Sequence, residues 1–98
     1  MTGQEANRQN RASLDEGKTG LSRYLDRLIH ERGFESYRAA SMKLYEGKRH
    51  KDPGAFYRWI EKGATPSPAS CRKIAITFGR TEAERLEIED RLLVLAGH

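Results

Sequence analysis

Apolar residues recur along this chain at helical spacing, and a glycine or a proline separates each apolar stretch from the next. The pattern is clearest in residues 21–33, where four apolar residues occupy positions i, i+4, i+7 and i+8 of one helical face: Leu21, Leu25, Leu28 and Ile29. Gly33 follows Arg32, an order that is typical of a helix C-terminus. We therefore expect a first helix over residues 21–33.

A second helix is expected over residues 35–47. Ser36 is a candidate N-cap and Gly47 is a candidate stop. At helical spacing one face of this segment holds Tyr37, Ala40, Ser41 and Leu44. Because Ala40 and Ser41 are small, we expect another helix to approach this face closely.

The stretch DPGAFYRWIEKG, residues 52–63, predicts a third helix. Asp52 is a candidate N-cap, Pro53 would occupy the first helical position, and Gly63 would end the helix. The segment carries more bulky residues than one buried stripe can hold: Phe56, Tyr57, Trp59 and Ile60. At least one of its aromatic side chains should therefore be exposed.

Two further helices complete the pattern. Ser67 begins one over residues 67–79. Its apolar stripe comprises Cys71, Ile74, Ala75 and Phe78. Thr81 and Glu84 form a capping box at the start of the last helix, residues 81–97. The apolar positions of that helix are Leu86, Leu92, Leu93 and Leu95. No stretch alternates strictly between apolar and polar residues, so the sequence predicts an all-α chain of five short helices.

The first twenty residues differ from the rest of the chain. Residues 1–20 are polar, contain one leucine and are interrupted by glycines. This composition predicts a flexible arm, with residues 21–98 as a single helical domain. Arg8 and Arg11 could lie along DNA, as basic arms do elsewhere, but the composition favours a solvated tail.

The charge distribution points to the middle of the chain as a surface for polyanions. The 98 residues carry a formal net charge of +4, and the isoelectric point is about 9.5. Residues 21–63 hold ten basic against six acidic residues, and residues 64–80 hold three basic residues and no acidic one. Residues 81–98 hold two basic against five acidic residues. A nucleic-acid surface is therefore expected in the middle, away from the acidic last helix.

Other classes of protein find little support in the sequence. The single cysteine, Cys71, indicates a reducing compartment, and its place on an apolar stripe favours a core position. His30 and His50 lack companions at ligand spacing, so we expect no metal and no cofactor. No phosphate-binding loop or catalytic triad appears, so an enzyme is not expected. The absence of an apolar run of about 18 residues argues against a membrane span and favours a cytoplasmic protein.

Four stretches together resemble one known family. They are LSRYLDRLIHERGF, the Ile-Glu-x-Gly segment within WIEKGATPSP, SPASCRKIAITFG, and TEAERLEIEDRLLVLAG. Their order and spacing are similar to the Cro/repressor-type helix-turn-helix family, also called the xenobiotic-response-element family, over residues 21–97. The resemblance implies a compact five-helix bundle of the lambda-repressor-like type, with residues 35–47 and 52–63 as its helix-turn-helix.

The resemblance also implies a role. Members of this family are mostly dimeric transcription regulators that bind palindromic operators, so the chain would be a sequence-specific DNA-binding regulator, with repressor as the first expectation. It would read the major groove of double-stranded DNA with helix 52–62 and associate with the nucleoid as a homodimer. Leu86 and Leu93, seven residues apart, suggest a dimer seam on the last helix, and the same leucines could instead serve the core alone.

Two features depart from the family pattern. The small residue of the second helix lies about six residues too far upstream for a tight turn, so either that helix is longer or a loop over residues 48–51 extends the turn. The family's base-reading positions fall on Gly54, Ala55 and Trp59, none of which can form a bidentate hydrogen bond with a base edge. In the same alignment Tyr57 and Ile60 face inward.

The predicted DNA contacts therefore fall into two groups. Phosphate contacts are expected from the basic residues Lys48, Arg49, Lys51, Arg58 and Lys62. Specificity would depend on Trp59, on close backbone approach at Gly54 and Ala55, and on DNA shape. For Trp59 the alternative is core packing beside Ile60, and at this point both interpretations remain open.

A second hypothesis keeps the fold and changes the partner. A helix-turn-helix can lose its DNA role, because a fold does not determine a function. The aromatic residues of helix 52–62, or the acidic last helix, would then bind another regulator or a sigma factor.

Overall fold

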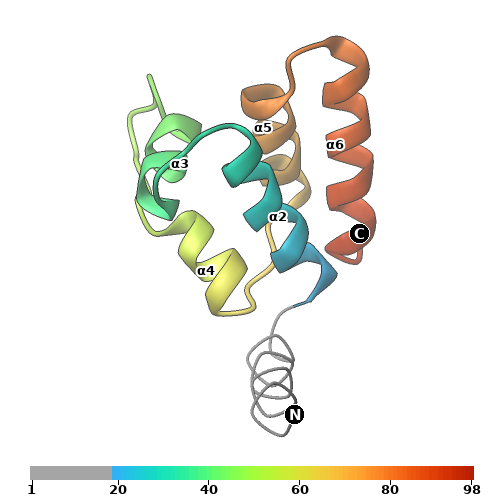
Figure 1. Cartoon of the computed structure of the whole chain (residues 1–98), viewed down its shortest axis with the longest axis horizontal. Helices are drawn as coiled ribbons and strands as arrows, with labels where there is room; N and C mark the ends of the chain where they lie inside the picture. The colour runs from blue at the N-terminus through green and yellow to red at the C-terminus, as the bar shows by residue number, and fades with distance from the viewer. Residues whose placement is uncertain (1–18) are drawn as a thin grey trace, which may run out of the picture.

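The computed structural model describes residues 19–98 and shows five helices (Figure 1). They are α2 (Gly20–Glu31), α3 (Tyr37–Leu44), α4 (Ala55–Glu61), α5 (Pro68–Phe78) and α6 (Glu82–Leu95). Within this range there is no strand. All five expected helices are therefore present, and the prediction of a compact all-helical chain is confirmed. No helix in the described range is both long and apolar enough to cross a bilayer.

The helices form a closed ring of contacts around one core. α4 packs against α2 and α3, whereas α5 packs against α3 on one side and α6 on the other. α2 also touches α6, which completes the ring. The apolar stripes predicted for residues 21–33 and 67–79 are buried in full, so spacing alone identified most of the core.

The last helix buries a different stripe from the expected one. Ile88 and Leu92 are its buried residues, whereas Leu86 is exposed and Leu93 is only partly buried against the core. The buried Ile88 and Leu92, with the partly buried Leu95, follow the spacing i, i+4 and i+7, which competes in the sequence with the 86–93 pair. Of the two residues predicted as a dimer seam, only Leu86 is substantially exposed, while Leu93 contributes to the core.

Several predicted helix starts are confirmed by their caps. The hydroxyls of Ser36 and Ser67 each accept a hydrogen bond from the backbone N–H three residues later. Thr81 does the same for Glu84, at 3.1 Å. The Glu84 carboxylate accepts from the N–H of Arg80 at 2.7 Å, rather than from the N-cap residue as the capping-box prediction required.

The first helix begins earlier than predicted. Its first residue is Gly20, and the Thr19 hydroxyl caps it by accepting a hydrogen bond from the N–H of Ser22 at 3.2 Å. These two residues therefore belong to the helical domain and not to the predicted arm. The remainder of that arm, residues 1–18 with Arg8 and Arg11, lies outside the described residues.

The start of α4 differs from the prediction. The helix begins at Ala55 with Gly54 as its N-cap, so Asp52 and Pro53 precede it. Asp52 accepts a hydrogen bond from the N–H of Gly54 at 3.2 Å, which makes a turn rather than a helix cap. The N–H of Phe56 is satisfied from another helix, because the buried hydroxyl of Ser41 in α3 accepts its hydrogen bond at 3.1 Å. This tertiary hydrogen bond satisfies an N–H in the first turn of α4, the role that was expected of Asp52.

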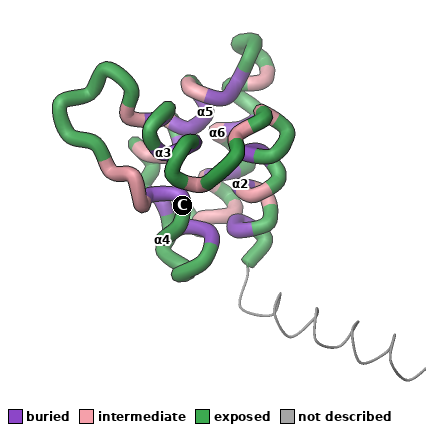
Figure 2. The backbone as a smooth tube through the Cα atoms, turned by 60° about the vertical axis from the view of Figure 1, so that its left-hand side comes forward, coloured by how far each residue is buried: buried purple, intermediate pink, exposed green. Residues whose placement is uncertain are grey.

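The connection between α3 and α4 is a long loop. Residues 45–54 join the two helices and extend from the bundle, with an exposed stretch in the middle (Figure 2). Of the two explanations for the long spacing, the structure therefore selects the loop and excludes a longer second helix. We call residues 45–54 the connecting loop.

Candidate nucleic-acid interface

One face of α4, the helix predicted to read DNA, belongs to the core. Its buried residues are Ala55, Phe56, Trp59 and Ile60. Ala55 is fully buried, and Trp59 is only 7% exposed. The Trp59 ring packs edge-to-face on Phe56, with the two ring centroids 5.3 Å apart. Of the two interpretations of Trp59, core packing is therefore the one that the structure shows. The burial of Ala55 and Trp59 does not favour the predicted DNA contacts, which stay predictions.

The rotation of α4 explains this result. Tyr57, expected to face inward, is 46% exposed, whereas Ile60 is buried as expected. Two buried serines fix the rotation: Ser41 accepts from the N–H of Phe56, and Ser22 in α2 donates to the carbonyl of Trp59 at 3.3 Å. Because both bonds reach backbone atoms of α4, they hold the helix in one orientation.

The outward face of α4 is close to electrically neutral. Arg58 forms an ion pair with Asp52, with Nη1 3.1 Å from Oδ1. The Lys62 ammonium lies over the Tyr57 ring, 5.7 Å from its centroid. Glu61, also on this face, accepts a hydrogen bond from the Tyr37 hydroxyl at 3.0 Å. Two cations and two carboxylates therefore offset one another along this helix, which offers little attraction for phosphate.

The Tyr37 hydroxyl is a fixed donor beside this face. It lies 3.2 Å from a carboxylate oxygen of Asp26 as well as 3.0 Å from Glu61. Burial raises the pKa of Tyr37 far above its ordinary value, and the hydrogen bond to Glu61 and the charge of Asp26 raise it further. The hydroxyl therefore stays protonated and holds two acidic side chains next to α4.

The connecting loop has the opposite character. Its consecutive residues Lys48, Arg49, His50 and Lys51 are all exposed. Within the described residues, none of their side chains forms an ion pair. The loop therefore presents three permanent positive charges and a histidine directly to solvent.

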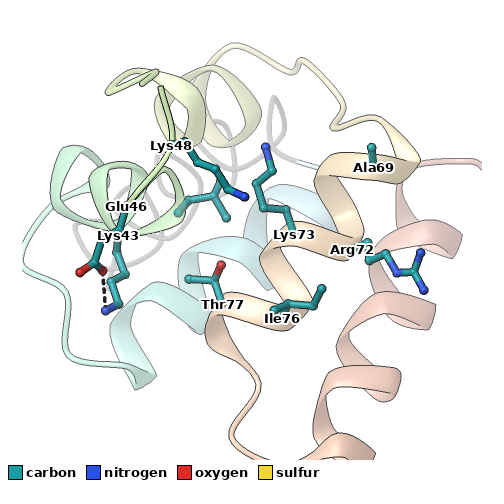
Figure 3. A pocket seen from close by; sticks show the side chains of 9 residues that line it. Lys43, Glu46, Lys48, Ala69, Arg72, Lys73, Ile76 and Thr77 are labelled. Carbon is teal, nitrogen blue, oxygen red and sulfur yellow. Dashed lines mark ion pairs between the residues drawn. The ribbon is translucent and has the colours of Figure 1, made fainter. Parts of the chain in front are cut away.

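A groove continues this cationic surface onto α5. It measures about 450 Å³ and lies between the C-terminal end of α3, the start of the connecting loop and α5 (Figure 3). Four basic residues line it: Lys43, Lys48, Arg72 and Lys73. Lys43 is paired with Glu46 at 2.7 Å, and the Lys73 ammonium lies 4.8 Å from the centroid of the Tyr45 ring. We call this hollow the α3–α5 groove.

The structure thus divides the predicted DNA contacts. Lys48, Arg49 and Lys51 lie together on the exposed loop, whereas Arg58 and Lys62 lie on the neutral face of α4. Gly54 is half-buried at the junction between loop and helix. Sequence reasoning missed Arg72 and Lys73, and the signal for them was their position beside the stripe of α5 on its polar side.

Other candidate chemistry is limited. Cys71 is fully buried, and burial raises the pKa of its thiol, so it remains protonated at neutral pH and is a poor nucleophile. Among residues 19–98, no group of three or more histidine, cysteine or acidic side chains is placed to hold a metal ion. Among the described surfaces, the connecting loop and the α3–α5 groove have the clearest preference, which is for anionic ligands.

Comparisons with protein-family models, with curated proteins and with solved structures found no match to this chain.

Proposed function

We propose that this protein binds double-stranded DNA and that the connecting loop is the main contact. The observation that carries the proposal is the run of exposed basic residues at 48–51, which projects from the bundle and whose side chains form no ion pair within the described chain. Lysine and arginine side chains in such a setting release counterions from the DNA phosphates when they bind, which favours association at low salt. The cations of the α3–α5 groove extend the same positive field.

The contacts should be to the DNA backbone more than to the bases. Two of the three expected reading residues, Ala55 and Trp59, are buried, and the third, Gly54, has no side chain. Arg58 could form a bidentate contact with guanine only after leaving its ion pair with Asp52. Phosphate contacts position a protein on DNA without reading the sequence, so we expect weak sequence discrimination that depends on DNA shape.

The regulatory role is the broader part of the proposal. It draws support from the resemblance to Cro/repressor-type helix-turn-helix proteins and from the five-helix arrangement. Under this proposal the protein acts in the cytoplasm on nucleoid DNA. The alternative, a protein partner bound by the aromatic residues of α4, is weakened because Phe56 and Trp59 are buried in the core.

The test is a selection from random DNA fragments with purified protein, followed by affinity measurements over a range of salt concentrations. We expect binding whose affinity falls steeply with salt and shows only weak enrichment of any sequence. A strongly enriched palindrome would contradict the proposed backbone contact and restore a sequence-reading element. Failure to bind DNA at low salt would overturn the proposed function.

A further inference from the structure

Only some of the basic side chains of the α3–α5 groove are placed to meet a ligand. Lys43 is paired with Glu46 at 2.7 Å, so these two charges offset each other at one end of the groove (Figure 3). Figure 3 also shows the guanidinium of Arg72 turned toward α6, away from the other basic residues. Lys48 and Lys73 therefore carry the remaining positive charge, and neither forms an ion pair within the described residues.

Lys48 and Lys73 reach the groove from different walls. Lys48 extends from the connecting loop toward α5, and Lys73 stands on α5 itself (Figure 3). Lys73 is half-buried, and its ammonium lies 4.8 Å from the centroid of the Tyr45 ring, a cation–π contact that holds the charge beside the groove. Thr77 follows Lys73 by one helical turn, and its hydroxyl can donate a hydrogen bond to a negative group. This end of the groove therefore favours an anion.

Between the charged side chains the lining of the groove is apolar. It comprises the buried Leu44 and the exposed Ala69 and Ile76, of which Ile76 is 56% exposed. The phosphate groups of DNA cannot cover these side chains favourably, because covering them from water requires apolar atoms. An occupant that uses the whole groove must therefore carry an apolar part as well as a negative charge.

The size of the groove indicates a small ligand. Its volume of about 450 Å³ lies within the range of small-molecule sites, roughly 300–1,000 Å³. We propose that the groove binds a small amphipathic anion, with its anionic head group between Lys48 and Lys73 and its apolar body against Leu44 and Ile76. The few polar groups orient the ligand, and the apolar lining contributes the area that it buries.

This site does not depend on the proposed function. Lys48 is the one residue of the run 48–51 that lines the groove. Arg49 and Lys51 lie outside it, so they stay available to DNA when an anion occupies the groove. Ligand binding itself needs no DNA, and the two activities can be measured separately.

Sodium octanoate is the probe, because it joins a carboxylate to an apolar chain. The full, isotope-labelled protein would be titrated at constant ionic strength and followed by the NMR shifts of its backbone amides. We expect saturable shifts at the amides that line the groove, with a Kd in the millimolar range or below for a ligand of about ten non-hydrogen atoms. Acetate, which lacks the chain, and octylammonium, which reverses the charge, should shift the same amides much less.

Substitutions test both parts of the site. Lys73→Gln removes one positive charge and Ile76→Ser removes an apolar contact, and each should raise the Kd for octanoate about two- to fivefold. Arg23→Gln and Val94→Ser make matched changes at exposed positions on α2 and α6, and they should leave the Kd unchanged. The amide spectrum of each variant establishes that it folds, and Lys48→Gln replaces Lys73→Gln if the latter does not.

The outcomes separate this site from simple charge attraction and from DNA binding. Octanoate that shifts the groove amides without saturation, or no more than octylammonium does, overturns the inference. Equal losses from Lys73→Gln and Arg23→Gln overturn it as well, since net charge alone would then attract the anion. Because the titration contains no DNA, its failure leaves the proposed function standing, and a failure to bind DNA leaves the groove ligand standing.

Discussion

The connecting loop and α4 are adjacent in the chain, yet they use their residues in opposite ways. α4 buries four residues of seven and neutralises most of the charges on its outward face. The loop buries nothing between residues 46 and 51 and leaves its cations open to solvent. An aromatic-rich helix can therefore be a structural element of the core, while the loop before it carries the exposed cations.

The cause of the difference lies in two serines of other helices. Ser22 and Ser41 are fully or almost fully buried, and each hydrogen-bonds to the backbone of α4. These bonds, together with the ring packing of Phe56 on Trp59, determine which side of α4 meets solvent. The loop has no comparable bond between residues 49 and 51 in the described structure.

The largest effect should come from removing the buried ring. Trp59→Ala creates a cavity beside Phe56 and should lower the free energy of unfolding by about 3–5 kcal/mol. Tyr57→Ala removes an exposed aromatic residue from the same helix and should change it by about 0.5 kcal/mol or less. Chemical denaturation of both variants measures the difference. Similar losses of unfolding free energy in the two variants would contradict the assignment of Trp59 to the buried face of α4 and Tyr57 to the exposed face.

Ser41→Ala should have the next largest effect. Without the hydroxyl, the buried N–H of Phe56 loses its acceptor, and we expect a loss of about 1–3 kcal/mol in the free energy of unfolding. Met42→Ala, at the exposed neighbouring position, serves as the control and should have little effect. If Ser41→Ala were as stable as wild type, the orientation of α4 would need another explanation.

Removing loop charges should alter DNA binding without altering stability. Arg49→Ala combined with Lys51→Ala should weaken DNA affinity for all sequences and reduce the slope of log affinity against log salt by about two. Arg23→Ala combined with Arg27→Ala removes the same charge from exposed positions on α2 and should leave the slope nearly unchanged. Equal effects of the two pairs would show that only net charge matters.

Asp52 lies where the loop meets α4, and its pH dependence should be the smallest effect. The Arg58 guanidinium, with the N–H of Gly54, holds the pKa of Asp52 below its ordinary 3.8. The ionised carboxylate therefore stabilises the fold above pH 3.8, and this contribution disappears as the pH falls through the lower folded value.

The measurement compares Tm of wild type and Asp52→Asn across pH. The wild type should be slightly more stable at neutral pH, and the gap should close in acid. The margin should be small because both side chains are substantially exposed. A gap that persists below the folded pKa would show that the carboxylate charge is not its source.

The sequence predicted the helices well because their signals are local. Apolar spacing located the five segments, and Ser36, Ser67 and Thr81 cap their own helices through bonds that span three residues. Local signals could not predict where α4 starts or how it is rotated in the bundle. The start and rotation of α4 depend on two long-range hydrogen bonds. The hydroxyl of Ser41 accepts from the N–H of Phe56, fifteen positions away, and the hydroxyl of Ser22 donates to the carbonyl of Trp59, thirty-seven positions away.

The candidate site was predictable in part. The run of cations at 48–51 is visible in the sequence, and the structure shows it exposed. The α3–α5 groove was not foreseen, because it forms only where α3 and α5 pack together and bring basic residues of both helices to one groove. The Leu86–Leu93 seam stays a prediction, whereas the core residues of α6 could not be foreseen, because two apolar spacings overlap in this helix and only packing selects between them.

Lysine footprinting tests the contrast between loop and helix most directly. The protein would be acetylated with and without a DNA duplex at low salt, and the modification of each lysine measured by mass spectrometry. Lys48, Lys51 and Lys62 are all exposed in the unbound protein, so each reports on its own surface. We expect DNA to protect Lys48 and Lys51 and to leave Lys62 reactive. Protection of Lys62 without protection of Lys48 and Lys51 would contradict the proposed loop contact and would indicate that α4 forms the DNA interface.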